Sequence, residues 1–137
     1  MPDQSARNPA IILVEDEPDI LIILHRLMRD LTGGYDIVTV NGGAEALAQI
    51  ALRPVPLVIT DYNMPGMNGI EVVSAIGRAR PGLPCIILSA HREESYITQA
   101  LSAGARGYIT KELPLAIVEG VERVLAGEVY LSEDLRK

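Results

Sequence analysis

Three carboxylates stand directly after short apolar runs of the sequence, where their side chains could meet. Glu15 and Asp16 follow the run 10–14, and Asp61 follows the run 57–60. Carboxylates that lie close together repel one another and tend to take up protons unless a cation neutralises them. A hard divalent ion with oxygen ligands suits such a place, and Mg²⁺ fits a site with few protein oxygens because it keeps several waters. The three residues therefore predict a magnesium site.

A hydroxyl group and an ammonium group follow two further apolar runs. Ser89 comes after the run 84–88, and Lys111 comes directly after Thr110. A carboxylate that faces a metal ion and a lysine is a good nucleophile for phosphorus, and both cations can spread the charge of the transferring group. The serine hydroxyl can donate a hydrogen bond to a phosphoryl oxygen once that group is attached. Together these residues predict formation of an acyl phosphate on Asp61.

Each of these residues also has a purely structural interpretation. A polar residue at the end of a strand is ordinary, and Glu15 and Asp16 could complement the dipole of a helix that begins at Pro18. The functional interpretation is favoured because polar residues at four strand ends would lie at the same edge of the sheet. Ligands of open parallel sheets bind at that edge, beyond the carboxyl ends of the strands.

The elements that must position these side chains alternate along the chain. Short apolar runs predict strands over 10–14, 35–40, 57–60, 84–88 and 106–110. Amphipathic spacing predicts helices over 18–32, 44–52, 69–80, 92–103 and 114–126. Five strand-then-helix units predict an α/β fold, with a parallel sheet that has helices on both faces.

Local signals predict where three of these helices begin or end. Asn68 and Glu71 have the spacing of a capping box, and Asn41 could cap the helix over 44–52. Gly104 is placed to end the helix over 92–103.

Length and composition exclude several classes of protein. The 137 residues suit one domain, and a hydrophobic share of 48% argues against disorder. A formal charge of −6 argues against direct contact with nucleic acid. Cys85 is the only cysteine, so an internal disulfide is excluded. The N-terminal residues lack the apolar stretch of a signal peptide and no apolar run approaches the ~20 residues that cross a membrane, so we expect a cytoplasmic protein.

Four segments of the chain resemble the receiver domain of two-component response regulators. They are VEDEPD (14–19), ITDYNMPGMNG (59–69), LSA (88–90) and GYITKE (107–112). The segments occur in the family's order and spacing. The resemblance implies a flavodoxin-like three-layer sandwich of five βα units, with strand order 2-1-3-4-5.

The same resemblance divides the chain into three parts. Residues 10–127 form the receiver domain. Residues 1–9 are expected to be a disordered lead-in, and residues 128–137 a C-terminal tail or the start of a linker.

The resemblance also implies a metal site and an acceptor. Asp61 falls on the phospho-acceptor, and Glu15 and Asp16 fall on the acidic pair that binds Mg²⁺. Asn63 falls on the position that supplies a backbone carbonyl to the metal, and its side chain lies where it can tune dephosphorylation.

Switch residues are implied in the same way. Ser89 falls on the switch hydroxyl, Tyr108 on the aromatic switch and Lys111 on the family's lysine. His91 lies where a side chain can tune the access of water to the phosphoryl group. Without the resemblance, Tyr108 could equally be a half-buried aromatic residue of a strand. His91 is then more simply explained as a polar loop residue.

The family's mechanism implies the partners of the chain. A sensor histidine kinase or a phosphotransfer protein presents a phosphohistidine, and the receiver catalyses transfer to its own aspartate. Such a domain is a signalling switch that catalyses only its own phosphorylation and dephosphorylation. The surface of the fourth helix, fifth strand and fifth helix then changes and controls an output.

Two positions depart from the family's usual pattern. Glu112 stands where the family usually has a proline in a cis bond after the lysine, so the isomer of the Lys111–Glu112 bond stays open. Glu15 replaces the commoner aspartate, which lengthens one metal-ligand arm. The Lys-Glu pair and the tail VLAGEVYLSEDLRK resemble a subgroup that carries a helix-turn-helix DNA-binding domain.

Other outputs and another class of protein remain as alternatives. The output implied by the subgroup is transcription through such a DNA-binding domain, with a homodimer through the last helices as one assembly. The first alternative is a free-standing receiver that acts by docking to a protein. The second is a phosphohydrolase with Asp61 as its nucleophile, although Asn63 takes the place where those enzymes have a second aspartate.

Overall fold

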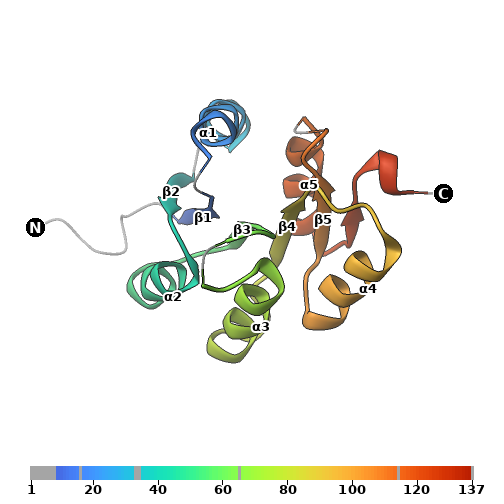
Figure 1. Cartoon of the computed structure of the whole chain (residues 1–137). Coiled ribbons are helices and arrows are strands. Elements are labelled where there is room, and N and C mark those ends of the chain that lie inside the picture. The colour runs from blue at the N-terminus through green and yellow to red at the C-terminus, as the bar shows by residue number, and fades with distance from the viewer. Residues whose placement is uncertain (1–8, 16, 33–34, 65, 114, 137) are drawn as a thin grey trace, which may run out of the picture.

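The chain folds into one parallel sheet with helices on both faces (Figure 1). The computed structural model describes residues 9–15, 17–32, 35–64, 66–113 and 115–136, with backbone alone for 27–32. The strands, in their order across the sheet, are β2 (Asp36–Val40), β1 (Ala10–Val14), β3 (Leu57–Asp61), β4 (Cys85–Ser89), β5 (Gly107–Thr110) and β6 (Tyr130–Leu131). The predicted α/β fold and the order 2-1-3-4-5 are confirmed.

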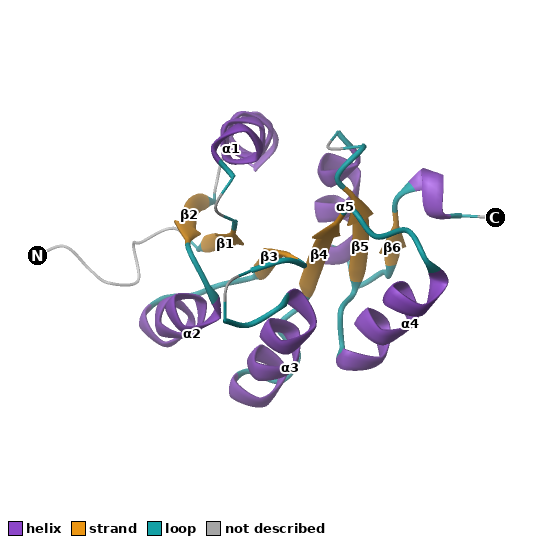
Figure 2. Cartoon of the chain, viewed as in Figure 1, coloured by secondary structure: helices purple, strands orange, loops and turns teal. Residues whose placement is uncertain are grey.

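The helices form two layers around this sheet (Figure 2). One face carries α1 (Pro18–Thr32) and α5 (Ala116–Leu125), and the other carries α2 (Gly43–Leu52), α3 (Gly69–Ala79) and α4 (Glu94–Ala103). None of the helices within the described residues combines the length and apolar character that a bilayer crossing demands.

Side chains of the strands alternate between two cores, one under each helix layer. In β1, Ile12 and Val14 join the core on the side of α2 and α3, whereas Ile11 and Leu13 join the core on the side of α1 and α5. Successive strand residues point to opposite faces, so a strand covered on both faces is apolar throughout. This is why the apolar runs of the sequence locate the strands so well.

A sixth strand lies outside the predicted pattern. β6 pairs in parallel with β5, with Gly107 opposite Tyr130 and Tyr108 opposite Leu131. A short 3-10 helix, η2 (Glu133–Leu135), follows it. Residues 128–136, called the tail below, therefore pack against the β5 edge of the sheet.

Two of the three predicted helix ends are confirmed. Asn68 and Glu71 form the capping box of α3, and Gly104 ends α4 with a φ of +114°. The prediction for Asn41 was wrong, because α2 begins at Gly43 and its N-cap is Gly42, which makes no side-chain capping bond. A Cβ at Gly43 would lie 2.7 Å from the Met67 sulfur, so a larger residue there would require the Met67 side chain to move.

Candidate active site at the carboxyl edge of the sheet

The ends of two neighbouring strands bring Glu15 and Asp61 together. Val14 lies opposite Thr60 in the β1–β3 pair, so the next residue along each strand reaches the same edge of the sheet. Both carboxylates are buried, with exposed fractions of 1% for Glu15 and 2% for Asp61. Two buried acids side by side need compensating positive charge.

Glu17 supplies a third carboxylate to this acidic cluster. One oxygen from each of Glu15, Glu17 and Asp61 lies within 4.8 Å of the others. The predicted ligand Asp16 lies outside the described residues. Sequence reasoning missed Glu17, although three consecutive acidic residues after the first strand were a signal that could have included it.

Lys111 brings its ammonium group into the acidic cluster. Its Nζ lies 2.9 Å from Asp61 Oδ2, 2.9 Å from Glu17 Oε1 and 3.7 Å from Glu15 Oε1. Burial alone would lower the pKa of Lys111, but its hydrogen bonds to Asp61 and Glu17 outweigh burial and raise the pKa above its ordinary value. The lysine therefore stays charged beside the carboxylates.

One oxygen of Glu15 is left without a hydrogen-bond donor. Glu15 Oε2 accepts a bond of 3.1 Å from the Glu17 N–H, whereas the buried Oε1 accepts none from the described residues. Burial raises the pKa of Glu15, the Glu17 N–H opposes that rise, and the charge of Asp61 adds to it. A buried, unsatisfied carboxylate oxygen beside two further acids is what a hard cation would satisfy, so the donor set fits Mg²⁺.

The backbone around Asp61 is held from two sides. The Tyr62 N–H donates to Leu88 O at 2.8 Å, and the Gly69 N–H donates to Tyr62 O at 2.7 Å. A Cβ at Gly69 would lie 2.8 Å from the Asp61 carbonyl oxygen, so only glycine allows the start of α3 to approach Asp61 this closely. The Asn63 N–H points at Asp61 Oδ1 over 3.4 Å, which is a long contact.

Ser89, His91 and Tyr108 form a connected group at the end of β4. Ser89 and Tyr108 are fully buried, at 0% exposed. Ser89 Oγ accepts a bond of 2.9 Å from the His91 N–H, and Tyr108 Oη donates to His91 O at 2.9 Å. Tyr108 thus lies inward, in the core on the side of α4.

An aromatic cluster lies beside Asp61. The rings of His91 and Tyr96 stack with centroids 4.1 Å apart, and Tyr62 meets the His91 ring edge-on at 5.1 Å. His91 therefore sits in a packed group beside the residue that follows Asp61. The Lys111–Glu112 peptide bond is trans, since the described residues contain no cis bond.

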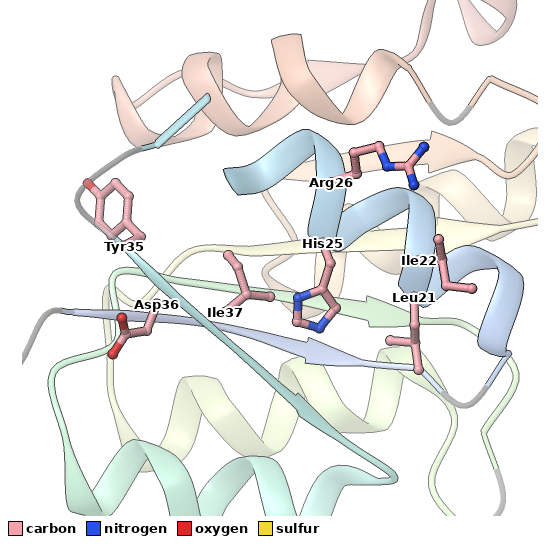
Figure 3. Close-up of a pocket in the computed structure, with 7 residues that line it drawn as sticks. All are labelled: Leu21, Ile22, His25, Arg26, Tyr35, Asp36 and Ile37. Atoms are coloured by element: carbon pink, nitrogen blue, oxygen red, sulfur yellow. The ribbon is translucent and has the colours of Figure 1, made fainter. Parts of the chain in front are cut away.

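A separate hollow lies far from these groups, between α1 and β2 (Figure 3). It has a volume of about 560 Å³, and in the close-up Leu21 and His25 extend from α1 toward β2. Tyr35 and Asp36 line it where β2 begins, whereas Glu15 and Asp61 lie where β1 and β3 end. This hollow is not part of the acidic site.

Comparison with known proteins places this arrangement in context. Residues 11–122 match the family described as the response regulator receiver domain. A transcriptional activator protein of Pseudomonas putida, ExaE, is 35% identical over 126 residues, covering 91% of this chain and 59% of that protein. The chain thus spans about three fifths of that relative's length.

Solved structures agree with the sequence comparison. A LuxR-family two-component response regulator from Aurantimonas sp. SI85-9A1 superimposes with a TM-score of 0.84 at 29% identity, covering 94% of this chain and 93% of that one. The phosphorylated cyanobacterial phytochrome response regulator RcpA superimposes with a TM-score of 0.72 at 27% identity, covering 88% of this chain and 95% of that one.

Proposed function

Because the chain belongs to the response regulator receiver domain family, a family of signalling domains and not of enzymes, we propose that Asp61 accepts a phosphoryl group. The donor is a phosphohistidine of a sensor histidine kinase or a phosphotransfer protein. Transfer forms a bond between an Asp61 oxygen and phosphorus while the bond from phosphorus to the donor nitrogen breaks. The leaving imidazole keeps that electron pair and takes up a proton.

The observation that carries this proposal is the contact between Asp61 and Lys111. The Asp61 carboxylate is 2% exposed and lies 2.9 Å from the Lys111 ammonium group, which holds it in a fixed position, as a nucleophile for phosphorus requires. As charge moves onto the phosphoryl oxygens, the same ammonium group can stabilise them.

Mg²⁺ is the metal that we propose for the acidic cluster. Glu15, Asp61 and Glu17 are the described residues that would hold it, together with Asp16 and the backbone carbonyl of Asn63. When bound, the ion supplies charge neutralisation and orientation for the phosphoryl group. The buried Glu15 Oε1 supports this assignment because, among the described residues, it accepts no hydrogen bond and has only the Lys111 ammonium group nearby as a cation, at 3.7 Å.

Ser89 and Tyr108 are proposed as the switch. The Ser89 hydroxyl would turn from its bond with the His91 N–H toward a phosphoryl oxygen, which loosens the loop that Tyr108 Oη also holds. Asn63 and His91 are proposed to set how readily water reaches the phosphoryl group. These changes would shift a population between two packed states of the α4–β5–α5 surface.

The output that we propose is control of transcription through a DNA-binding region. The support is that the similar protein from Pseudomonas putida is named a transcriptional activator, and that the similar structure from Aurantimonas is named a LuxR-family regulator. The proposal places the receiver in the cytoplasm with a kinase as its partner, and allows a homodimer. The alternative is that the receiver acts by docking to another protein. Coding sequence for a DNA-binding region downstream of Lys137 would favour the first output over the second.

Phosphorylation can be tested by intact mass, which suits a chain with no tryptophan to report the change by fluorescence. The protein would be incubated with Mg²⁺ and acetyl phosphate, with Asp61→Asn and a chelator-treated sample alongside. Asp19→Asn is a matched control, because Asp19 is an exposed acid of α1. We expect one added phosphoryl group in the wild type and in Asp19→Asn, and none in Asp61→Asn or without metal. A folded wild type that gains no mass would overturn the proposal.

A further inference from the structure

The two neighbours of Lys111 are held by side chains from outside β5. Thr110 Oγ1 donates a bond of 2.6 Å to Asp134 Oδ2, which belongs to the tail. Glu112 Oε2 accepts a bond of 2.8 Å from Arg92, which lies between β4 and α4. Lys111 itself reaches the acidic cluster, so its side chain and those of its two neighbours have different partners.

Arg92 and Asp134 are also joined to each other. Arg92 Nη1 lies 3.4 Å from Asp134 Oδ2, and Arg92 Nη2 donates to the Asp134 carbonyl oxygen at 3.3 Å. Thr110, Asp134, Arg92 and Glu112 therefore form a continuous chain of polar contacts that brackets Lys111. We call these four residues the clamp.

Asp134 is the best-anchored member of the clamp. Its Oδ1 accepts a bond of 2.8 Å from Ser132 Oγ, and the same Ser132 oxygen accepts a bond of 3.1 Å from the Thr110 N–H. Ser132 is fully buried, and Asp134 is only 16% exposed in its side chain. Three hydrogen bonds thus link Thr110, Ser132 and Asp134 into one connected group.

The Arg92–Glu112 pair contributes less than Asp134. Its side chains are 45% and 68% exposed, and exposed ion pairs hold geometry only weakly. The backbone of Lys111 is instead fixed by its own N–H, which donates to Ser89 O at 3.0 Å, and by the two bonds that hold Thr110.

We propose that Asp134 is a positioning residue for the phosphoryl-transfer site. Through Thr110, and with help from Arg92, it fixes the backbone from which Lys111 reaches Asp61. Because residue 112 is glutamate, this backbone has no proline ring to stiffen it, and in this proposal the tail takes over that task. The proposal rests on the proposed function of Asp61 and assigns the tail a part in that chemistry.

A competing explanation is that the same contacts only fasten the tail to the sheet. In that case loss of Asp134 would lower the free energy of unfolding and leave the chemistry of the folded protein unchanged. A double-mutant cycle separates the two explanations, because a residue that acts through Lys111 has no effect once Lys111 is absent.

The variants are Asp134→Ala and Thr110→Val, each in the wild type and in a Lys111→Met background. Thr110→Val removes the same hydrogen bond without substituting a residue of the tail, so it takes the place of Asp134→Ala in the test if that variant fails to fold. Glu133→Ala is the matched control, because Glu133 is an exposed acid one residue away. The initial rate of adduct formation with Mg²⁺ and acetyl phosphate is followed by intact mass, at a temperature where thermal melting shows each variant folded.

We expect Asp134→Ala and Thr110→Val to slow phosphorylation by about tenfold, since a displacement of ~1 Å in a positioning group can cost up to about a hundredfold. Glu133→Ala should react at the wild-type rate. In the Lys111→Met background, both variants should change the residual rate by less than about twofold. A wild-type rate in a folded Asp134→Ala, or an equal loss with and without Lys111, would overturn the proposal.

Amide hydrogen exchange tests the clamp independently of phosphorylation. In Asp134→Ala, the amides of residues 110, 111 and 113 should exchange faster, whereas Glu133→Ala should leave them unchanged. If the wild type accepts no phosphoryl group, the proposed function fails while this measurement still decides the clamp. Unchanged exchange of these three amides in Asp134→Ala would overturn the proposed role of the clamp.

Discussion

At the scale of single residues, three carboxylates share the ammonium group of Lys111. Glu15 and Asp61 are buried and cannot exchange this contact for water, whereas the Glu17 side chain is 56% exposed. Their contributions to cation binding should therefore differ. In the proposed metal site, the buried pair would set the position of the ion, and Glu17 would add charge from the solvent side.

Glu17→Gln should weaken Mg²⁺ binding by about fivefold. The lost attraction is that of a solvent-exposed charge for a divalent ion a few ångströms away, about 2 kcal/mol at the dielectric constant of water, which screening by salt reduces to about 1 kcal/mol. Isothermal titration with MgCl₂ would measure it, with Glu45→Gln, an exposed acid of α2, as the control. An unchanged affinity in Glu17→Gln would show that this carboxylate is not part of the metal site.

Much of the site's geometry could be predicted from the sequence because topology brings strand ends together. Glu15, Asp61 and Lys111 each stand within one residue of a strand's carboxyl end, and parallel strands deliver those ends to one edge. Glu17 could not be placed this way, since its position depends on the turn between β1 and α1. The inward position of Tyr108 depends likewise on its bond to the His91 carbonyl, which is a tertiary contact.

At the scale of elements, α3 connects the acceptor loop to the sheet and begins with a complete capping box. The Asn68 side chain accepts from the Glu71 N–H at 2.9 Å, and Glu71 accepts from the Asn68 N–H at 2.9 Å. Near its other end, Gly77 leaves open space where a Cβ would stand. The same helix thus offers one substitution that should weaken it and one that should strengthen it.

Asn68→Ala should lower the free energy of unfolding by about 1 kcal/mol, because the Glu71 N–H loses the side-chain oxygen that accepts its hydrogen bond. Gly77→Ala should raise it by about 0.5 to 1 kcal/mol, because alanine loses less backbone freedom in a helix. Urea denaturation followed by circular dichroism would measure both. A stabilising Asn68→Ala would contradict the role of the capping box.

The tail shows where pattern-based prediction ends. β6 has two residues, so it carries no periodic signal, and its hydrogen bonds exist only because β5 offers a free edge. Asn41 illustrates another limit: its side chain suits a cap, but α2 begins at Gly43 after an N-cap at Gly42 that makes no side-chain bond. Strand positions and the two helix ends marked by the Asn68 capping box and by Gly104 could be predicted, whereas the short edge strand and the start of α2 could not.

At the scale of the whole molecule, the tail joins the reacting edge of the sheet to the C-terminal end of the described chain. Asp134 contacts Thr110, the neighbour of Lys111, and the relative from Pseudomonas putida is longer than this chain. A change at Asp61 that moved Lys111 would therefore also alter the contact between Thr110 and Asp134 of the tail. By thermodynamic linkage, anything that holds the tail in place should equally affect the site.

Stability at acid pH should depend on Asp134. Burial alone would raise its pKa, but bonds from Thr110 and Ser132 and the charge of Arg92 outweigh burial and lower the pKa below its ordinary value. Around these pH values the unfolded state therefore binds more protons than the folded state. The contribution of Asp134 to the free energy of unfolding is present above its ordinary pKa of 3.8 and is lost as the pH falls through the lower pKa of the folded state. Asp134→Asn should flatten the pH dependence of the unfolding free energy below about pH 4, measured by urea denaturation, whereas Glu133→Gln should not. Parallel curves for Asp134→Asn and wild type would contradict this.

The central claim is that the phosphoryl group resides on Asp61, and chemical mapping tests it most directly. Protein treated with Mg²⁺ and acetyl phosphate is reduced with borohydride, which converts an aspartyl phosphate to homoserine, and its peptides are then sequenced by mass spectrometry. We predict homoserine at position 61 and unchanged aspartate at every other aspartate position, with the homoserine signal lost when the metal is chelated. Reduction at another aspartate, or a phosphoryl group that survives borohydride on a serine or histidine, would contradict the account.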